Sequence, residues 1–220
     1  MNITNDIVAA YIDTLYKSGS ADLQNLRATA EQNHVPIILR DTENLLRLIV
    51  KLKKPARVLE IGTAVGFSSC VFAECCGCRV TTIEHEGETA AIAEANIRSL
   101  GFEDRIKVLR GEGTEVLKTL QESERDGGFQ RFDMVFIDAA KSHYREFWNL
   151  SLPLLAEGGL IICDNVLQKG MTASDEFDTR RRYKTSIRRM REFIKYINSA
   201  EDFDTAVLPV GDGVSISISK

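Results

Sequence analysis

Residues 57–66 read Arg57-Val58-Leu59-Glu60-Ile61-Gly62-Thr63-Ala64-Val65-Gly66, a short apolar run followed by two glycines. The apolar part, residues 57–61, is typical of a buried β-strand. Gly62 and Gly66 allow the backbone to turn tightly and approach a ligand, and Ser68 can cap or bind at the start of a following helix. The stretch therefore predicts a strand, a turn and a helix. The turn is either a ligand site or purely structural.

The same alternation continues along the chain. Four more short apolar runs occupy residues 79–83, 106–109, 133–137 and 159–163. Helix-like stretches lie between the runs, at residues 68–76, 87–100, 112–123 and 144–155. Near-continuous apolar strands are typical of parallel strands covered on both faces, and each helix is long enough for a crossover. We predict a doubly wound α/β sheet.

The C-terminal end departs from this alternation. Residues 205–209 and 214–218 are two strand-like runs that only four residues separate. So short a connection cannot hold a crossover helix, so the two runs must form an antiparallel hairpin. We therefore expect seven strands, mostly parallel, ending in one reversed strand.

Length and composition point to a single domain. The chain has 220 residues, of which 44% are hydrophobic, enough for one core. We assign residues 1–220 to one domain in which residues 1–55 form a helical cover. We find no apolar run of membrane-spanning length and no secretion signal, and the five cysteines are clustered and odd in number. We expect a cytoplasmic protein with reduced thiols.

The acidic residue Glu84 ends the second predicted strand, about twenty residues after the glycine turn. An acidic side chain at this place can accept both hydroxyls of a ribose. The glycine spacing is not the G-x-G-x-x-G of NAD-binding turns, and Glu60 suits a cofactor with a cationic amino group. These features favour S-adenosylmethionine.

Three oxygen-bearing side chains follow the fourth and fifth strands. Asp138 follows the fourth strand and Asp164-Asn165 follow the fifth, so the three side chains should meet at the carboxyl edge of the sheet. Two carboxylates and an amide oxygen suit Mg²⁺ or Ca²⁺, although both aspartates could instead cap helices. Lys141, three residues beyond Asp138, is a candidate general base or a solvated charge. We expect His143 to cap or pack its helix rather than bind metal.

The segment from Arg180 to Lys195 is strongly basic. It carries eight Lys or Arg and one Glu, a charge of +7, so the remaining chain sums to −11 for an overall charge of −4. Such asymmetry favours an anionic partner such as RNA, with phosphate contacts that add affinity without choosing a sequence. Apolar residues recur through the segment at helical spacing, so a merely solvated helix face is the alternative.

Together these motifs resemble the cation-dependent O-methyltransferases, the family of caffeoyl-CoA and catechol methyltransferases. The resemblance is carried by residues 60–66, residues 138–141, Asp164-Asn165 and residues 208–213, and it covers nearly the whole chain. It implies a class I methyltransferase, Rossmann-like fold and a homodimer. It also implies three sets of site residues: Asp138, Asp164 and Asn165 for Mg²⁺ or another divalent cation; Ile38, Glu60, Gly62, Ser68, Glu84, Gly113 and Asp138 for S-adenosylmethionine; and Lys141 with Asp138 for catalysis.

Within this family the chain is most similar to compact bacterial enzymes that methylate 5-hydroxyuridine in tRNA anticodon loops to 5-methoxyuridine. The shared features are residues 34–37, Lys54-Pro55 and the basic segment. The first hypothesis is therefore a tRNA methyltransferase, and the alternative is a small-molecule catechol or caffeoyl-CoA-like O-methyltransferase. A non-catalytic nucleotide-binding or RNA-binding protein is the third. Glu112-Gly113 departs from the aspartate-alanine pair common in the family, which puts the adenine contacts in question.

Overall fold

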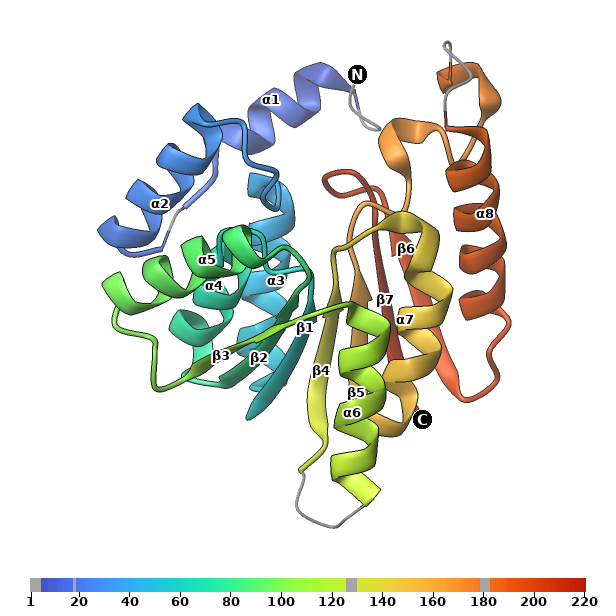
Figure 1. The fold of residues 1–220 in the computed structure, drawn as a ribbon. Coiled ribbons are helices and arrows are strands. Elements are labelled where there is room, and N and C mark those ends of the chain that lie inside the picture. Colours follow the sequence, from blue (N-terminus) through green and yellow to red (C-terminus); the bar gives the residue numbers. More distant parts are fainter. Residues whose placement is uncertain (1–4, 18, 126–129, 179–182) are drawn as a thin grey trace.

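The computed structural model describes residues 5–17, 19–125, 130–178 and 183–220. These residues form one sheet with helices on both faces (Figure 1). The strands are β1 (Arg57–Ile61), β2 (Arg79–Glu84), β3 (Ile106–Arg110), β4 (Phe132–Ile137), β5 (Leu155–Cys163), β6 (Phe203–Leu208) and β7 (Val214–Ser219). The α-helices are α1 (Asp6–Thr14), α2 (Ala21–Gln32), α3 (Arg40–Lys53), α4 (Phe67–Cys76), α5 (Gly87–Ser99), α6 (Gly113–Arg125), α7 (Tyr144–Ser151) and α8 (Lys184–Asn198).

The sheet has the strand order β3-β2-β1-β4-β5-β7-β6. Strands β1 to β5 pair in parallel, while β7 runs antiparallel to both β5 and β6. The predicted fold class and the C-terminal hairpin are confirmed. The reversed strand is not the last in the sheet, however, because the connection through α8 carries β6 beyond β5 and leaves a gap that β7 fills.

Both faces of the sheet are apolar, which explains why its strands show no polar alternation. Along β1, Val58 packs with α3 and α4 on one face, and Leu59 packs with α6 and α7 on the other. The two neighbours point in opposite directions because successive side chains of a strand alternate. Glu60 therefore faces α4, and Ile61 faces the opposite side.

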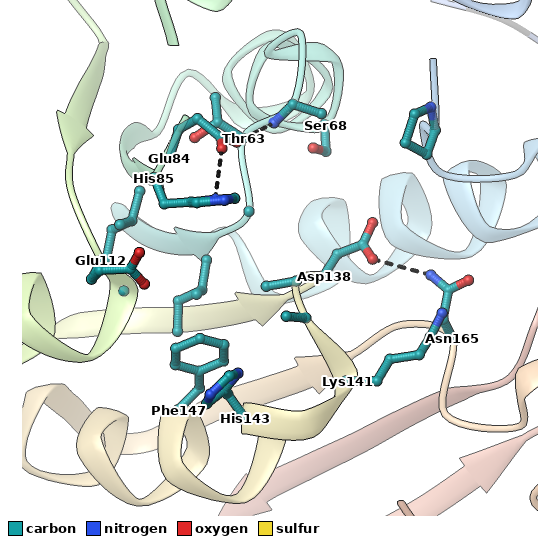
Figure 2. A pocket seen from close by; sticks show the side chains of 18 of the residues that line it. Thr63, Ser68, Glu84, His85, Glu112, Asp138, Lys141, His143, Phe147 and Asn165 are labelled. Atoms are coloured by element: carbon teal, nitrogen blue, oxygen red, sulfur yellow. Dashed lines mark hydrogen bonds and ion pairs between the residues drawn. The ribbon is translucent and has the colours of Figure 1, made fainter. Parts of the chain in front are cut away.

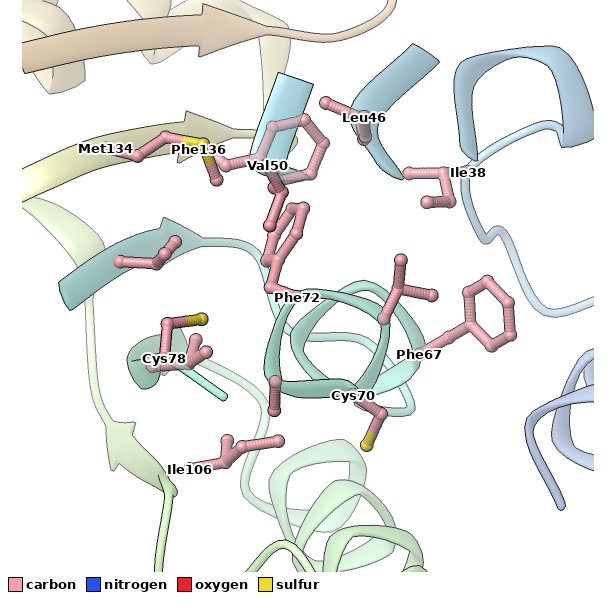
Figure 3. Packing of buried hydrophobic residues seen from close by; sticks show 14 of the residues in the cluster. Ile38, Leu46, Val50, Phe67, Cys70, Phe72, Cys78, Ile106, Met134 and Phe136 are labelled. Atoms are coloured by element: carbon pink, nitrogen blue, oxygen red, sulfur yellow. The ribbon is translucent and has the colours of Figure 1, made fainter. Parts of the chain in front are cut away.

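The N-terminal helices pack onto the sheet through α4. Leu46 and Val50 of α3 are fully buried near Phe72 of α4 and Phe136 of β4 (Figure 3). The two phenyl rings meet edge to face, with centroids 5.4 Å apart, a favourable geometry for aromatic pairs. In the ranges that the structure describes, no helix combines the length and apolar character that crossing a membrane requires.

One predicted helix is shorter than expected. The sequence pattern predicts a helix over residues 144–155. In the structure α7 ends at Ser151, and a 3₁₀ turn over Leu152–Leu154 leads into β5. Pro153 explains the change, because proline has no N–H to donate and its ring obstructs a continuing α-helix. Strand β5 consequently begins at Leu155 rather than at residue 159.

Candidate active site

A pocket of about 620 Å³ lies at the carboxyl ends of β1, β2 and β4. This is the edge at which open α/β sheets bind ligands. Figure 2 shows two groups of polar side chains at opposite ends of the pocket: Glu84, His85 and Glu112 at one end, and Asp138, Lys141 and Asn165 at the other. Of the residues predicted to contact a cofactor, the ones that line it are Ile38, Gly62, Ser68, Glu84, Gly113 and Asp138.

The glycine turn shapes the floor of the pocket. Gly62 has φ +100°, and its N–H donates to the carbonyl of Ile83 at 3.0 Å. A Cβ at this position would collide with the backbone carbonyl of Asp138, which crosses directly over it. Gly62 is therefore required by a close approach of two strand ends as well as by the turn. Gly66, with φ +82°, then precedes the first residue of α4.

Glu84 is held by backbone donors on both oxygens. Its Oε2 accepts from the N–H of Ala64 at 3.0 Å and its Oε1 from the N–H of Glu86 at 3.1 Å. The residue is 7% exposed and lines the pocket. Oε2 keeps a second lone pair for a ligand hydroxyl, whereas Oε1 also faces Nδ1 of His85 at 3.2 Å, so a hydroxyl at Oε1 would replace the exposed His85 ring.

Glu60 lies outside the pocket, although the sequence placed it among the cofactor-lining residues. Its position in β1 turns it toward α4, where it is fully buried and accepts hydrogen bonds from the Ser68 and Ser69 hydroxyls. Burial raises the pKa of Glu60 to about 7, against the opposing effect of these hydroxyls. Glu60 can reach a ligand only through Ser68, which does line the pocket.

The three predicted metal ligands come together. The Asn165 side-chain amide donates to Oδ1 of Asp138 at 3.1 Å, and the backbone N–H of Asn165 donates to Oδ1 of Asp164 at 2.7 Å. Asp138 and Asn165 line the pocket, and Asp164 lies beside them with 2% exposure. Burial raises the pKa of both carboxyls, and repulsion from Asp138 raises the pKa of Asp164 further.

This cluster fits a hard divalent cation. Burial and mutual repulsion make the two neighbouring carboxyls costly to ionise. A cation that binds between them stabilises their ionised form. Among the described residues, neither carboxylate has an ion-pair partner within bonding distance. The described part of the chain has no group of three His, Cys, Asp or Glu side chains placed for a metal, so the third donor here is an amide.

The loop between β6 and β7 braces the metal-ligand loop. Val166 and Leu167 donate their N–H groups to the carbonyls of Gly213 and Asp212, each at 2.9 Å. A Cβ on Gly213 would approach Leu167, so glycine permits this contact. The predicted resemblance around residues 208–213 thus corresponds to a structural support for Asp164 and Asn165.

Lys141 stands at the same end of the pocket, at the start of a 3₁₀ turn over Lys141–His143. It is half-buried, and its charge lowers the pKa of Asp138. Two further clefts share Lys141 with the pocket, one lined also by Arg145 and Arg189 and one by Lys169 and Tyr183. Lysine and arginine side chains therefore line the clefts beside Lys141, together with the carboxylates of Glu146, Glu192 and Asp212.

Several lining residues were missed by the sequence analysis. His143 precedes α7 and packs on Phe147, with ring centroids 5.9 Å apart, and both rings line the pocket. His143 packs at its helix start as expected. Phe147 also touches the position of Gly113, where a Cβ would lie 2.8 Å from the ring. The spacing of four between two aromatic residues on one helix was the available signal.

The basic segment is described only from Tyr183 onward; Arg180, Arg181 and Arg182 lie outside the described residues. Helix α8 buries Ile187, Met190, Phe193 and Ile197, with Ile194 half-buried, so it is amphipathic as predicted. Arg188 and Arg189 are exposed. Arg191 instead donates to the carbonyls of Thr172 and Met171 and pairs with Asp175.

Comparison with known proteins gives one consistent family. Residues 16–220 match a family model described as O-methyltransferase. A catechol O-methyltransferase from Niastella koreensis is 31% identical over 182 residues, which cover 80% of this chain and 78% of that protein. The structure of a candidate caffeoyl-CoA O-methyltransferase from Staphylococcus aureus superposes with a TM-score of 0.88 at 30% identity, covering 98% of this chain and 100% of that one. A Podospora anserina methyltransferase bound to S-adenosylhomocysteine (SAH) has a TM-score of 0.86 at 25% identity, covering 98% and 94%.

Proposed function

The chain belongs to the O-methyltransferase family, and from this premise we propose that it moves a methyl group from S-adenosylmethionine to a hydroxyl oxygen of an acceptor with two neighbouring oxygens. The observation that carries the proposal is the cluster of Asp138, Asp164 and Asn165 at one end of a pocket whose other end holds Glu84. A nucleoside cofactor and a chelating acceptor would then meet between the two ends.

The cofactor end has a role for each lining residue. Glu84 would accept the ribose hydroxyls, because its two oxygens are already oriented by backbone donors. Gly62 leaves room for the ligand beside the strand end, and Ser68 offers a hydroxyl to its amino-acid part. Phe147 and His143, whose ring planes are tilted by 43°, would supply an aromatic wall for the adenine.

The acceptor end supplies the chemistry. Asp138, Asp164 and Asn165 would hold a Mg²⁺ ion, which when bound stabilises the oxyanion of the acceptor. Lys141, whose ammonium form a nearby cation disfavours, would take the proton from the acceptor hydroxyl as a neutral amine. The oxygen then forms a bond to the methyl carbon while the bond from that carbon to sulfur breaks, leaving the neutral thioether SAH. The pocket contributes by fixing the oxygen and the methyl group in line.

The acceptor class that the relatives support best is a small aromatic diol. They are named catechol and caffeoyl-CoA O-methyltransferase, and both names describe acceptors with two neighbouring hydroxyls on an aromatic ring. The sequence analysis ranked tRNA first, and the relatives favour the alternative instead. One observation keeps 5-hydroxyuridine in tRNA as the second candidate: Lys169, Arg145 and Arg189 line clefts that share Lys141 with the pocket. Phosphates could bind these side chains while the base enters beside Asp138.

A methyl-transfer assay with two arms tests the proposal and distinguishes the two acceptors. The enzyme is incubated with labelled S-adenosylmethionine and Mg²⁺, with catechol in one arm and tRNA from cells lacking the gene in the other. We expect a methylated catechol, and we expect EDTA to abolish the product and Mg²⁺ to restore it. If the label appeared in 5-methoxyuridine and catechol stayed unmethylated, tRNA would be the acceptor. Full activity in EDTA would overturn the role of the cation.

We also propose that the chain forms a homodimer. Helix α3 exposes Leu48 and Leu52, which are 57% and 75% exposed and lie one turn apart. Apolar side chains grouped on one helix face are typical of protein contacts. Light scattering should give twice the mass of one chain, 2 × 24.6 kDa, and Leu52→Glu should halve it.

A further inference from the structure

A short strap closes one side of the cofactor pocket. Residues 35–39 link α2 to α3 without regular secondary structure, and Pro36, Ile37 and Ile38 line the pocket. The same three residues line a second cavity, of about 1020 Å³, whose wall also includes residues of α1. The strap therefore separates two cavities, and it is anchored by Ile38, which is 3% exposed and packs into the core.

Arg27 of α2 connects this strap to the start of α4. The side chain is nearly buried, and its Nη2 donates to the carbonyl of Ile38 at 3.0 Å. Its guanidinium lies over the ring of Phe67, 4.5 Å from the centroid. Phe67 follows the glycine turn, and both Phe67 and Ile38 line the pocket. One guanidinium thus contacts two walls of the pocket without lining it.

The orientation of Arg27 is fixed by a buried carboxylate. Glu43 has no exposed surface, and its Oε2 accepts from Nε and Nη2 of Arg27 at 3.2 and 2.6 Å. The same carboxylate accepts from Arg47 at 2.6 Å and from the Tyr16 hydroxyl at 2.6 Å. Burial and the neighbouring Glu43 raise the pKa of Tyr16 to about 12, so its hydroxyl remains a donor. A buried carboxylate that accepts hydrogen bonds on both oxygens holds its donors in one geometry.

We propose that Arg27 is a positioning residue for the cofactor: through the Ile38 carbonyl and the Phe67 ring it holds the strap and the start of α4 in the conformation that binds S-adenosylmethionine. Binding of the cofactor is then coupled to the packing of α2, although none of the described residues of α2 lines the pocket. The inference rests on the proposed function only for the identity of the cofactor and not for the acceptor.

The test compares Arg27→Lys with Arg47→Lys. Arg47 also donates to Glu43, and it bonds Glu74 and Cys75 where Arg27 bonds the strap and stacks on Phe67. Lysine keeps the charge at both positions but has no planar fork to bond Glu43 and Ile38 together while stacking on Phe67. Calorimetric titration with SAH should show a dissociation constant raised roughly tenfold for Arg27→Lys and less than about twofold for Arg47→Lys. The KM for S-adenosylmethionine should rise likewise, with kcat at saturating cofactor nearly unchanged.

Equal weakening by both variants, or none by Arg27→Lys, would overturn the inference. Failure of the wild type to bind SAH would instead refute the cofactor assignment. If Arg27→Lys does not fold, hydrogen exchange on the wild type decides. SAH should slow exchange in α2 as well as in the segments that line the pocket, and protection confined to those segments would contradict the coupling.

Discussion

The pocket has two walls that are held in different ways. At the carboxyl edge of the sheet, the backbone fixes the site: Asp138 and Asp164 donate their N–H groups to the carbonyls of Ile61 and Ile137, each at 3.0 Å. In the N-terminal cover, the charged side chains of buried Arg27 and Glu43 and half-buried Arg47 fix the pocket wall instead. Side-chain changes at the edge should therefore remove chemistry and leave the fold, whereas changes in the cover should cost stability.

The largest effect is expected for Asp164→Asn. The substitution removes one charge from the proposed cation site, and we expect kcat to fall by at least about a hundredfold. Stability without metal should not fall, because the change removes a carboxyl whose pKa is raised by burial and, in addition, by repulsion from Asp138. Turnover and thermal unfolding are measured together, and SAH should still bind.

Asp204→Asn serves as the control for that variant. Asp204 lies in β6 with its side chain 73% exposed, far along the sheet from the cluster, and its loss should leave turnover unchanged. If Asp164→Asn kept more than about a tenth of the wild-type activity, the cluster would not be the catalytic cation site.

The second prediction concerns the cover. Glu43→Gln leaves the buried charge of Arg27 without its buried carboxylate and leaves the half-buried Arg47 with Glu74 alone, and we expect a loss of about 3–5 kcal/mol in the free energy of unfolding. The matched control is Arg40→Gln, which removes exposed ion pairs with Asp13 and Glu31 and should cost at most about 1 kcal/mol. Urea denaturation measures both. Equal losses would mean that burial does not distinguish the two networks.

The same contrast explains what the sequence could predict. The sheet, the glycine turn and the cluster of Asp138, Asp164 and Asn165 follow from one rule, since parallel strands bring their carboxyl ends to one edge. No such rule predicts the burial of Arg27 and Glu43. A charged residue on a helix is expected to be solvated until its tertiary neighbours are known. The direction of Glu60 was also open: where both faces of a sheet are apolar, the pattern does not say which face a strand residue points to.

The third prediction returns to the sheet edge, where the backbone is expected to tolerate no Cβ. Gly62→Ala combines a positive φ with a collision against the Asp138 carbonyl and should cost about 2–5 kcal/mol. Gly158→Ala is the matched control, since Gly158 also has a positive φ, +63°, but nothing lies within 4 Å of its Cβ position. Its cost should be about 1–2 kcal/mol. If the two substitutions cost the same in thermal or urea unfolding, the approach of Asp138 does not constrain residue 62.

The smallest effect is expected for Glu60→Gln, and it appears mainly in the pH dependence of stability. The pKa of Glu60 is raised by burial from its ordinary 4.5 to about 7, so the folded state binds a proton more tightly than the unfolded state. Its contribution to stability is then fully present below pH 4.5 and is lost as the pH rises to about 7.

Glutamine cannot ionise, so the variant should lose less stability than the wild type between pH 4.5 and 7. At pH 8 the two should differ by only about 1 kcal/mol, because removing the buried charge is offset by the weaker hydrogen bonds from Ser68 and Ser69. Urea midpoints across this pH range measure the difference. Parallel curves for the two proteins would mean that Glu60 already ionises in the folded state near its ordinary pKa, and that its burial beside α4 is compensated by the serine hydroxyls alone.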